Sequence, residues 1–145
     1  MMIIRRMEKL PEDIYQLATE AREQGFRFLD RLIDDFQSGN NRFDLPGEAL
    51  FAVFESGKCI GVGGVNVDPL GQSTCTGRVR RVFVSSAVRG QGVGKLLMLE
   101  IENWAKVRFT QLQLFTDTPG ASAFYGSLGY QKVEETRISH IKRLA

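Results

Sequence analysis

The sequence predicts a mixed α/β fold, and three observations support this prediction. The chain has 145 residues, 43% of them hydrophobic and 25% charged, which is typical of one ordinary folded domain. Short β-rich apolar runs alternate with segments whose apolar residues recur at helical spacing. No internal repeat, low-complexity tract or linker interrupts the pattern, so residues 1–145 are expected to form a single domain with the element order βααβββαβαββ.

The N-terminal half is expected to open with a strand over residues 2–7, followed by two helices. Proline and two acids at residues 11–13 suit the first turn of a helix. Apolar residues then recur at helical spacing over 14–21 and again over 28–36. The next two expected strands, joined as in a hairpin, are Ala49–Glu55 and Cys59–Val67.

The C-terminal half is expected to begin with a strand that follows Ala49–Glu55 and Cys59–Val67. A glycine-rich loop and a helix come directly after this strand. Thr118 and Pro119 have the residue types of an N-cap and a first helical position, and Gly129 is typical of a helix end. The expected strands are 78–84, 112–116, 130–133 and 138–144, and the expected helices are 93–105 and 119–128.

Charge and cysteine content exclude several classes of protein. The net charge of +2 is too small to indicate a nucleic-acid or membrane partner. Cys59 and Cys75 form no disulfide framework and no zinc-binding pattern, so no metal is expected. No export signal or membrane-spanning run is recognised, and a cytoplasmic location is the expectation.

The glycine-rich loop that follows the expected strand 78–84 is the clearest candidate site. Gly90, Gly92 and Gly94 remove side chains from the start of the following helix, where backbone N–H groups lack partners and favour an anion. Five basic residues and no acidic one surround the loop: Arg78, Arg80, Arg81, Arg89 and Lys95. The sequence therefore predicts a phosphate-like anion site here.

Two common phosphate-binding motifs do not fit this loop. A Walker A motif would need glycine at Arg89 and serine or threonine at Leu96. A Rossmann fingerprint would need glycine at Lys95 and a place near the first strand of the fold. A glycine-rich turn without a ligand stays open as the alternative.

Two motifs in this order resemble the GNAT superfamily of acetyl-coenzyme A dependent N-acetyltransferases. Residues 89–94 (RGQGVG) resemble the family's pyrophosphate-binding signature, Arg/Gln-x-x-Gly-x-Gly/Ala. Residues 121–130 (ASAFYGSLGY) resemble its second motif, A-x-x-FY-x-x-LGF. The resemblance implies a mostly antiparallel mixed sheet, splayed between strands 4 and 5 and flanked by about four helices.

The resemblance also implies how acetyl-coenzyme A would bind. Backbone groups of Val82, Phe83 and Val84 would pair with the pantetheine arm, which enters the splay like a further strand. The amides of the loop would hold the pyrophosphate, through Arg89, Gly90, Gln91, Gly92, Val93, Gly94 and Lys95. Thr118 stands where the family often has an asparagine that reaches the cofactor, so a contact from Thr118 is left open.

Acetyl transfer to an amine needs a polarised thioester carbonyl, a proton for the leaving thiolate and a base for the amine. By position in the motif, Tyr125 matches the family's general acid, and the Val82 backbone N–H would polarise the carbonyl. A packing role for Tyr125 stays open. No base is assigned. The acids expected near strand ends are Glu48, Glu55 and Asp117, and each is expected to be a solvated carboxylate.

Other polar and aromatic residues are expected to be structural. His140 lacks a catalytic constellation, Cys59 is expected in the core and Cys75 at the surface. Trp104 lies in the apolar stripe of its helix. Because neither thiol has the surroundings of a nucleophile, direct transfer in a ternary complex is expected.

The acceptor amine is not fixed by the sequence. Residues 12–35 carry a local charge of −4, which would suit a polyamine, an amino sugar, or a protein lysine or N-terminus, unless it is only a solvated helix face. An apolar pocket built from Phe26, Phe28, Phe36 and Phe43 is the other possibility.

A homodimer is compatible with the family. A non-catalytic acetyl-coenzyme A binding module stays open as a second function, and nucleic-acid binding lacks interleaved aromatics.

Overall fold

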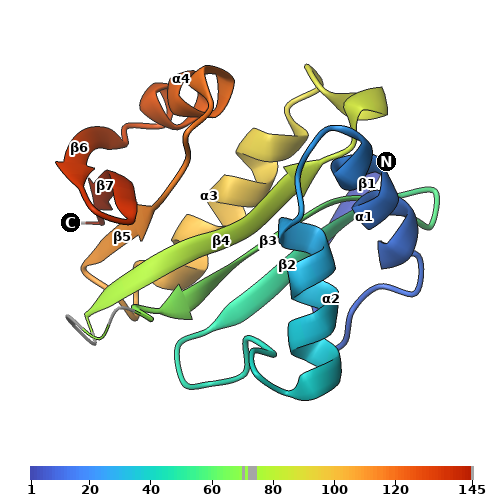
Figure 1. The fold of residues 1–145 in the computed structure, drawn as a ribbon, viewed down its shortest axis with the longest axis horizontal. Helices are drawn as coiled ribbons and strands as arrows, with labels where there is room; N and C mark the ends of the chain where they lie inside the picture. The colour runs from blue at the N-terminus through green and yellow to red at the C-terminus, as the bar shows by residue number, and fades with distance from the viewer. Residues whose placement is uncertain (70, 72–74, 145) are drawn as a thin grey trace.

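The computed structural model describes residues 1–69, 71 and 75–144, which form one seven-stranded sheet with four α-helices (Figure 1). The order of strands in the sheet is β1-β2-β3-β4-β5-β7-β6. The strands are β1 (Met2–Arg6), β2 (Ala49–Glu55), β3 (Lys58–Val67), β4 (Thr76–Val84), β5 (Gln111–Leu114), β6 (Gln131–Glu135) and β7 (Ile138–Arg143). The helices are α1 (Ile14–Glu23), α2 (Phe28–Ser38), α3 (Val93–Ala105) and α4 (Pro119–Ser127). The predicted element order and mixed α/β class are confirmed.

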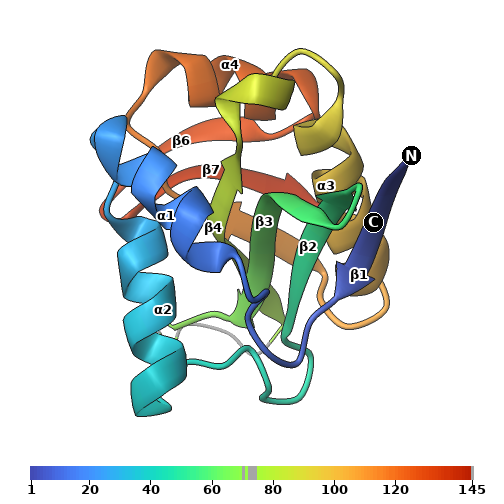
Figure 2. The ribbon, with the colours of Figure 1, turned by 90° about the vertical axis from the view of Figure 1, so that its right-hand side faces the viewer.

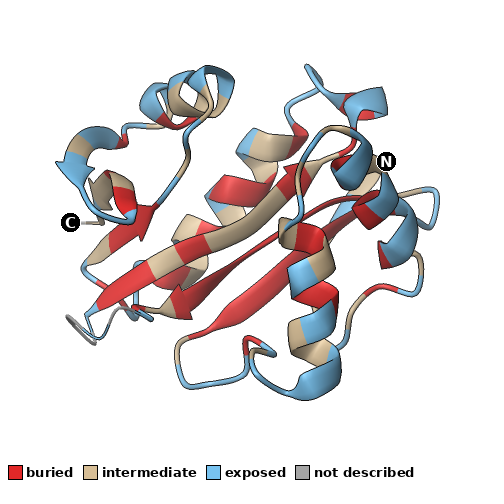
Figure 3. Cartoon of the chain, in the orientation of Figure 1, coloured by how far each residue is buried: buried red, intermediate tan, exposed pale blue. Residues whose placement is uncertain are grey.

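Helices cover both faces of the sheet. Figure 2 shows α1 and α2 on one side of the central strands and α3 on the other. Each side has its own apolar core: Leu97 and Ile101 of α3 lie in one, and Leu17 and Leu32 of α1 and α2 lie in the other. Figure 3 shows buried residues concentrated along β2, β3 and β4, which lie between the two cores. Coverage on both faces explains why β2 and β3 are largely apolar, whereas β4 also carries three arginines.

The sheet is mostly antiparallel, with one short parallel pair between β4 and β5. These two strands pair over Thr76–Arg78 and Gln111–Gln113 only. Beyond Arg78, β4 continues to Val84 with no paired residue on β5 (Figure 1). The predicted splay between the fourth and fifth strands is therefore confirmed, and it leaves an unpaired backbone edge on β4.

A β-bulge lies in β4 at the start of the splay. Val62 pairs with Phe83 and Gly64 with Arg80, so two residues of β4 face the single Gly63 of β3. Arg81, in the bulge, has φ of +62°, a left-handed conformation that is strained for an L-residue. A Cβ on Gly63 would lie 2.9 Å from Val82 Cγ2, so the bulge requires glycine at this position.

Element boundaries differ from the predictions mainly at the first helix. Residues 11–13 precede α1 instead of forming its first turn. Asp13 is the N-cap residue, and its carboxylate accepts a hydrogen bond from the Cys59 backbone N–H, 2.9 Å away, instead of capping the helix. A 3₁₀ turn, Ser86–Val88, also separates β4 from the glycine loop. In the described part of the chain, no helix is long and apolar enough to cross a membrane.

The structural roles expected for Cys59 and Trp104 are confirmed. Cys59 is buried in the core beneath α1 and α2. Trp104 packs edge-on against Phe51, and its indole N–H donates to the Gly47 carbonyl at 3.0 Å. Cys75 is exposed.

Candidate functional site

The glycine loop joins β4 to α3 and leaves the start of that helix bare. Gly90 and Gly92 have φ of +84° and +81°, which glycine adopts without strain. A Cβ built on either residue meets no heavy atom within 4 Å, so open space lies in front of this backbone. The predicted absence of side chains at the helix start is confirmed for these two glycines.

The backbone N–H groups of the loop form a concentrated set of donors. Arg89 N and Gln91 N donate to Ser86 and Val88 carbonyls in turns, at 3.4 and 3.3 Å. Leu96 N makes the first bond of α3, to the Gly92 carbonyl. The remaining amides have no acceptor among the described residues: Gly90, Gly92, Val93, Gly94 and Lys95. A helix N-terminus with this many free donors suits an oxyanion with several oxygens.

Gly94 has a different role from the other two glycines of the motif. It lies within α3, and a Cβ on it would come within 3.2 Å of Phe124 Cζ. The absence of a side chain here lets α4 approach α3 through Phe124. The motif glycines therefore serve both the open backbone and the contact between two helices.

The basic side chains do not converge on the loop as their spacing suggested. The Arg89 guanidinium donates to the Val84 carbonyl at 3.2 Å and to Gln24 at 2.7 Å. Lys95 is exposed. Arg81 contacts Asp35 of α2, on the face of the sheet away from α3. The positive character of the loop therefore comes from its amides and the helix dipole more than from the surrounding arginines.

Helix α1 holds the turn that precedes the loop through Glu20, a residue that the sequence analysis did not single out. The Glu20 carboxylate accepts hydrogen bonds from Ser85 Oγ at 2.8 Å and Ser86 N at 2.6 Å. Burial alone would raise the pKa of Glu20, but these hydrogen bonds and the nearby Arg89 outweigh it and lower the pKa below its ordinary value. No local sequence pattern signals this contact, because its partners lie more than sixty residues apart.

Tyr125 lies on α4, in an aromatic cluster beside the splay. Its ring packs against those of Phe124 and Tyr130, with centroids 5.1 and 5.5 Å away. Burial raises the pKa of the Tyr125 hydroxyl above its ordinary value, so it stays protonated at neutral pH. No described residue forms a hydrogen bond with the hydroxyl, and this oxygen is not one of the fully buried side-chain atoms that lack a partner. A protonated phenol with a free hydroxyl can give a proton to a group that enters beside it.

His140 packs beside Tyr125 and joins three elements. The two ring centroids are 6.3 Å apart. His140 Nε2 lies 3.0 Å from Ser122 Oγ of α4, and Nδ1 lies 2.8 Å from Ser139 Oγ. Ser139 Oγ in turn accepts from Thr116 N, just after β5. Burial and then Lys132 lower the pKa of His140, so the imidazole is neutral at pH 7 and holds α4 against the sheet, a packed role as the sequence analysis expected.

Thr118 caps α4 as predicted. Its hydroxyl accepts from Ala121 N at 3.4 Å and lies 3.3 Å from Thr116 Oγ1. The Thr118 side chain is therefore engaged within the chain.

The three acids considered as bases lie in different places. Glu48 is buried, and its carboxylate accepts from the backbone N–H groups of Leu45 and Val67 and from Asn66. It is therefore a structural carboxylate, contrary to its expected solvated character. Asp117 is exposed after β5, and Glu55 ends β2, two strands from β4. The structure does not bring these acids together.

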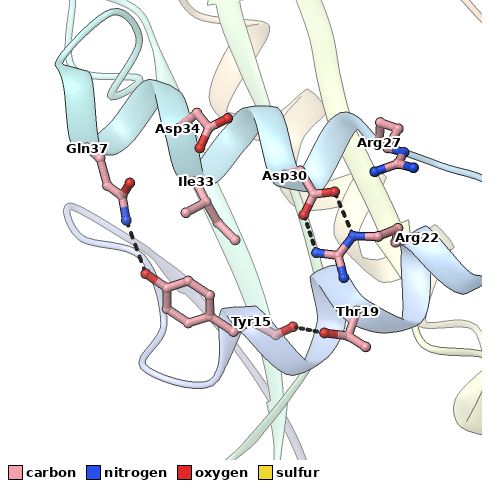
Figure 4. A pocket seen from close by; sticks show the side chains of 8 residues that line it. All are labelled: Tyr15, Thr19, Arg22, Arg27, Asp30, Ile33, Asp34 and Gln37. Carbon is pink, nitrogen blue, oxygen red and sulfur yellow. Dashed lines mark hydrogen bonds and ion pairs between the residues drawn. The ribbon is translucent and has the colours of Figure 1, made fainter.

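The acids of α1 and α2 are largely engaged within the chain. Asp30 forms an ion pair with Arg22 at 2.6 Å, and Asp35 faces Arg81 at 3.6 Å. Figure 4 shows the Arg22–Asp30 pair in a pocket between the two helices, where Gln37 also donates to the Tyr15 hydroxyl. Neither the glycine loop nor β4 lines this pocket. Because Arg22 already contributes to the local charge of −4, the Asp35–Arg81 pair is the only ion pair among the described residues that offsets part of that charge from outside residues 12–35.

The phenylalanines considered as an acceptor pocket pack into the core instead. Phe43 is buried, and its ring fills the space beside Gly64. Phe28 packs against Phe26 and Phe83, and Phe36 lies against the same core.

A family model from known proteins matches the part of the chain that forms this site. The model of the acetyltransferase (GNAT) family matches residues 11–130, which include the glycine loop and Tyr125. The chain belongs to the GNAT family of acetyltransferases. The comparison with curated proteins found no match.

Solved structures of GNAT acetyltransferases have the same fold. A candidate acetyltransferase from Exiguobacterium sp. 255-15 is 25% identical, with a TM-score of 0.89 over 99% of this chain and 93% of that one. An acetyltransferase of the GNAT family from Staphylococcus aureus Mu50 is 13% identical, with a TM-score of 0.75 over 99% and 100% of the two chains. A candidate acyl-CoA N-acyltransferase from Klebsiella pneumoniae is 22% identical, with a TM-score of 0.65 over 100% and 99%.

Proposed function

We propose that this GNAT chain is a single-domain N-acetyltransferase that moves the acetyl group of acetyl-coenzyme A to a primary amine by direct attack in a ternary complex. The observation that carries the proposal is the set of five free amides at the start of α3, directly after a strand whose edge has lost its partner. The diphosphate suits the amides, and an extended amide-containing arm suits the strand edge.

The residues proposed to bind acetyl-coenzyme A follow from this arrangement. The unpaired edge of β4 offers backbone groups to the pantetheine arm, and the open space beside Gly90 and Gly92 admits the diphosphate. The proposed set is Val82, Phe83, Val84, Arg89, Gly90, Gln91, Gly92, Val93, Gly94, Lys95, Thr118 and Tyr125.

In the proposed reaction, the amine nitrogen attacks the thioester carbon, a C–N bond forms and the C–S bond breaks. The Val82 N–H, in the bulge, would stabilise the negative charge that develops on the carbonyl oxygen. Tyr125 would give its phenolic proton to the leaving sulfur, and the proton that the attacking nitrogen loses as the amide forms would return to the phenolate through solvent. The ammonium form of the acceptor would first lose a proton to water, since no carboxylate is assigned as the base.

The test is to mix the purified chain with acetyl-coenzyme A and a panel of primary amines, and to follow release of the free thiol. We expect thiol release that depends on one class of amine, with the acetylated amine detected by mass spectrometry in equal amount. Tight binding of acetyl-coenzyme A with no turnover of any amine would instead support the non-catalytic binding module.

A further inference from the structure

Three arginines of β4 lie on the same face of the sheet, toward α1 and α2. Arg78 pairs with Asn66 and Arg80 with Gly64, and these β3 residues share a face with Val62 of the α1 and α2 core. Regular alternation would turn Arg81 to the opposite face. The bulge instead directs it to the same side, where its guanidinium lies 3.6 Å from Asp35.

Three carboxylates among the described residues lie near these arginines, Asp35, Glu48 and Asp68, and only one of them is paired with an arginine of the cluster. Asp35 forms the only ion pair that any of the three makes with the described residues. Arg78 donates to the Arg137 carbonyl at 2.7 Å, and Arg80 makes a long contact of 3.5 Å with Asn66. Glu48 already accepts three hydrogen bonds from other groups. Two further arginines, Arg31 and Arg137, lie near the same side chains, so the face holds more positive than negative charge.

Two guanidinium nitrogens in this cluster are buried without a partner, Arg78 Nη1 and Arg81 Nε. The Arg81 side chain is only 11% exposed. Leaving a charged donor buried and unpaired is unfavourable, so such atoms indicate a partner absent from the chain itself. Burial, followed by repulsion from Arg80, lowers the pKa of Arg81 to about 10, which still leaves it charged at neutral pH.

The cluster lies beside the proposed path of the thioester. β4 loses its β5 partner after Arg78, and Arg80 and Arg81 follow immediately along the unpaired segment. A group bound by them on the α1 and α2 face lies next to the strand edge proposed to hold the pantetheine arm. We propose that the acceptor amine carries an oxyanion, a carboxylate or a phosphate, that is bound by Arg80 and Arg81. This inference rests on the proposed function and replaces the cationic acceptor that the charge of residues 12–35 suggested.

Guanidinium groups recognise carboxylates and phosphates through two parallel N–H donors, which a lone amine or sugar hydroxyl cannot match. The unpartnered Arg81 Nε is one such donor. In this proposal the strained bulge has a function, because it places Arg81 beside Arg80 on the face of β4 that is toward α1 and α2.

The first experiment compares matched pairs of amines in the thiol-release assay. The pairs are β-alanine with its amide and aminoethyl phosphate with ethanolamine, so that carboxylate and phosphate are tested separately. We expect kcat/KM to be at least tenfold higher for the anionic member of one pair. Preference for the neutral member in both pairs would overturn the inference while leaving the proposed acetyl transfer intact.

The second experiment assigns the preference to Arg81. In Arg81→Gln, we expect kcat/KM for the anionic amine to fall about 10- to 100-fold, the effect of losing a charge-assisted hydrogen bond, and the neutral partner's value to change less than threefold. Arg5→Gln, with the same charge change on the exposed face of β1, serves as the control and should leave both values unchanged. A preference that survives in Arg81→Gln contradicts the assignment.

A binding measurement decides the case in which no amine of the panel reacts. With coenzyme A present at saturation, inorganic phosphate and acetate are titrated while the arginine Nε–Hε signals are followed by NMR. We expect the Arg81 signal to move and saturate at millimolar anion, with the Arg5 signal unmoved. An unmoved Arg81 signal overturns the inference, whereas failure of coenzyme A itself to bind contradicts the proposed function.

Discussion

Tyr125 combines three properties that a proton donor to a thiolate needs. Its ring is buried against Phe124 and Tyr130, its hydroxyl forms no hydrogen bond with a described residue, and burial keeps it protonated at neutral pH. His140 supports it indirectly, because its contact with Ser122 fixes the helix that carries Tyr125. The same packing would also be explained by a core role, so activity has to separate the two.

The Tyr125→Phe variant separates proton donation from packing, because phenylalanine keeps the ring and removes the hydroxyl. We expect kcat to fall about 100-fold, the lower range for losing a general acid, while the affinity for acetyl-coenzyme A changes less than threefold. Steady-state kinetics and calorimetry measure the two quantities. Unchanged kcat in the variant would show that Tyr125 is only a core aromatic.

The β4–loop–α3 unit places strain and open backbone side by side. Arg81, with positive φ, lies on the segment of β4 that has no β5 partner, and Gly90 and Gly92, also with positive φ, leave the start of α3 without side chains. The glycines and the helix could be predicted from the sequence, because residue type determines which positions adopt positive φ easily. The bulge could not, because an arginine at positive φ is stabilised only by contacts made in three dimensions, such as its ion pair with Asp35.

Gly92→Ala tests the open backbone against a matched control. Gly57 has φ of +79° and open space around it, as Gly92 does, but lies in the turn between β2 and β3. We expect each alanine variant to lose about 1 kcal/mol of unfolding free energy from the strained φ. Only Gly92→Ala should bind acetyl-coenzyme A at least fivefold more weakly. Equal affinities in the two variants would contradict an anion site at this loop.

Helix α1 and the loop are coupled through Glu20, and this coupling predicts a pH dependence. Because the folded pKa of Glu20 is lowered, its stabilising contribution is present above the unfolded pKa of about 4.3 and is lost as pH falls through the folded value. We expect Glu20→Gln to be about 1 kcal/mol less stable than the native chain at pH 7, with the difference shrinking below about pH 4. Denaturant unfolding across this pH range measures it.

Glu23→Gln is the control for Glu20, since Glu23 is exposed on the same helix. It should change stability little at any pH. A Glu20→Gln variant that matches this control at pH 7 would show that the hydrogen bonds to Ser85 and Ser86 do not stabilise the loop.

At the scale of the whole molecule, the element order and the splay between β4 and β5 could be predicted from the sequence. The hydrogen-bond and ion-pair partners of the charged side chains could not. Hydrophobic spacing located every strand and helix to within a few residues, and the two motifs implied the topology. The side-chain pairs of Glu20 with Ser85, of Arg81 with Asp35 and of Glu48 with Asn66 join distant segments, so local composition could predict neither these pairs nor the burial of Glu48.

The two cysteines report on the integrity of the whole fold. Burial raises the pKa of Cys59 to about 11, so at pH 8 roughly a thousandth of it would be thiolate, whereas Cys75 is exposed. We expect a thiol reagent to label Cys75 at once in the native chain and Cys59 only at the rate of unfolding. Both should react at once in urea. Rapid labelling of both thiols in the native state would contradict the packed core beneath α1 and α2.

The central claim is that the free amides before and within the first turn of α3 bind the diphosphate of acetyl-coenzyme A. An amide NMR titration with acetyl-coenzyme A measures this directly, residue by residue. The account predicts the largest downfield shifts at the amides with no acceptor: Gly90, Gly92, Val93, Gly94 and Lys95. Saturable binding that moves other amides and leaves these five in place would contradict it.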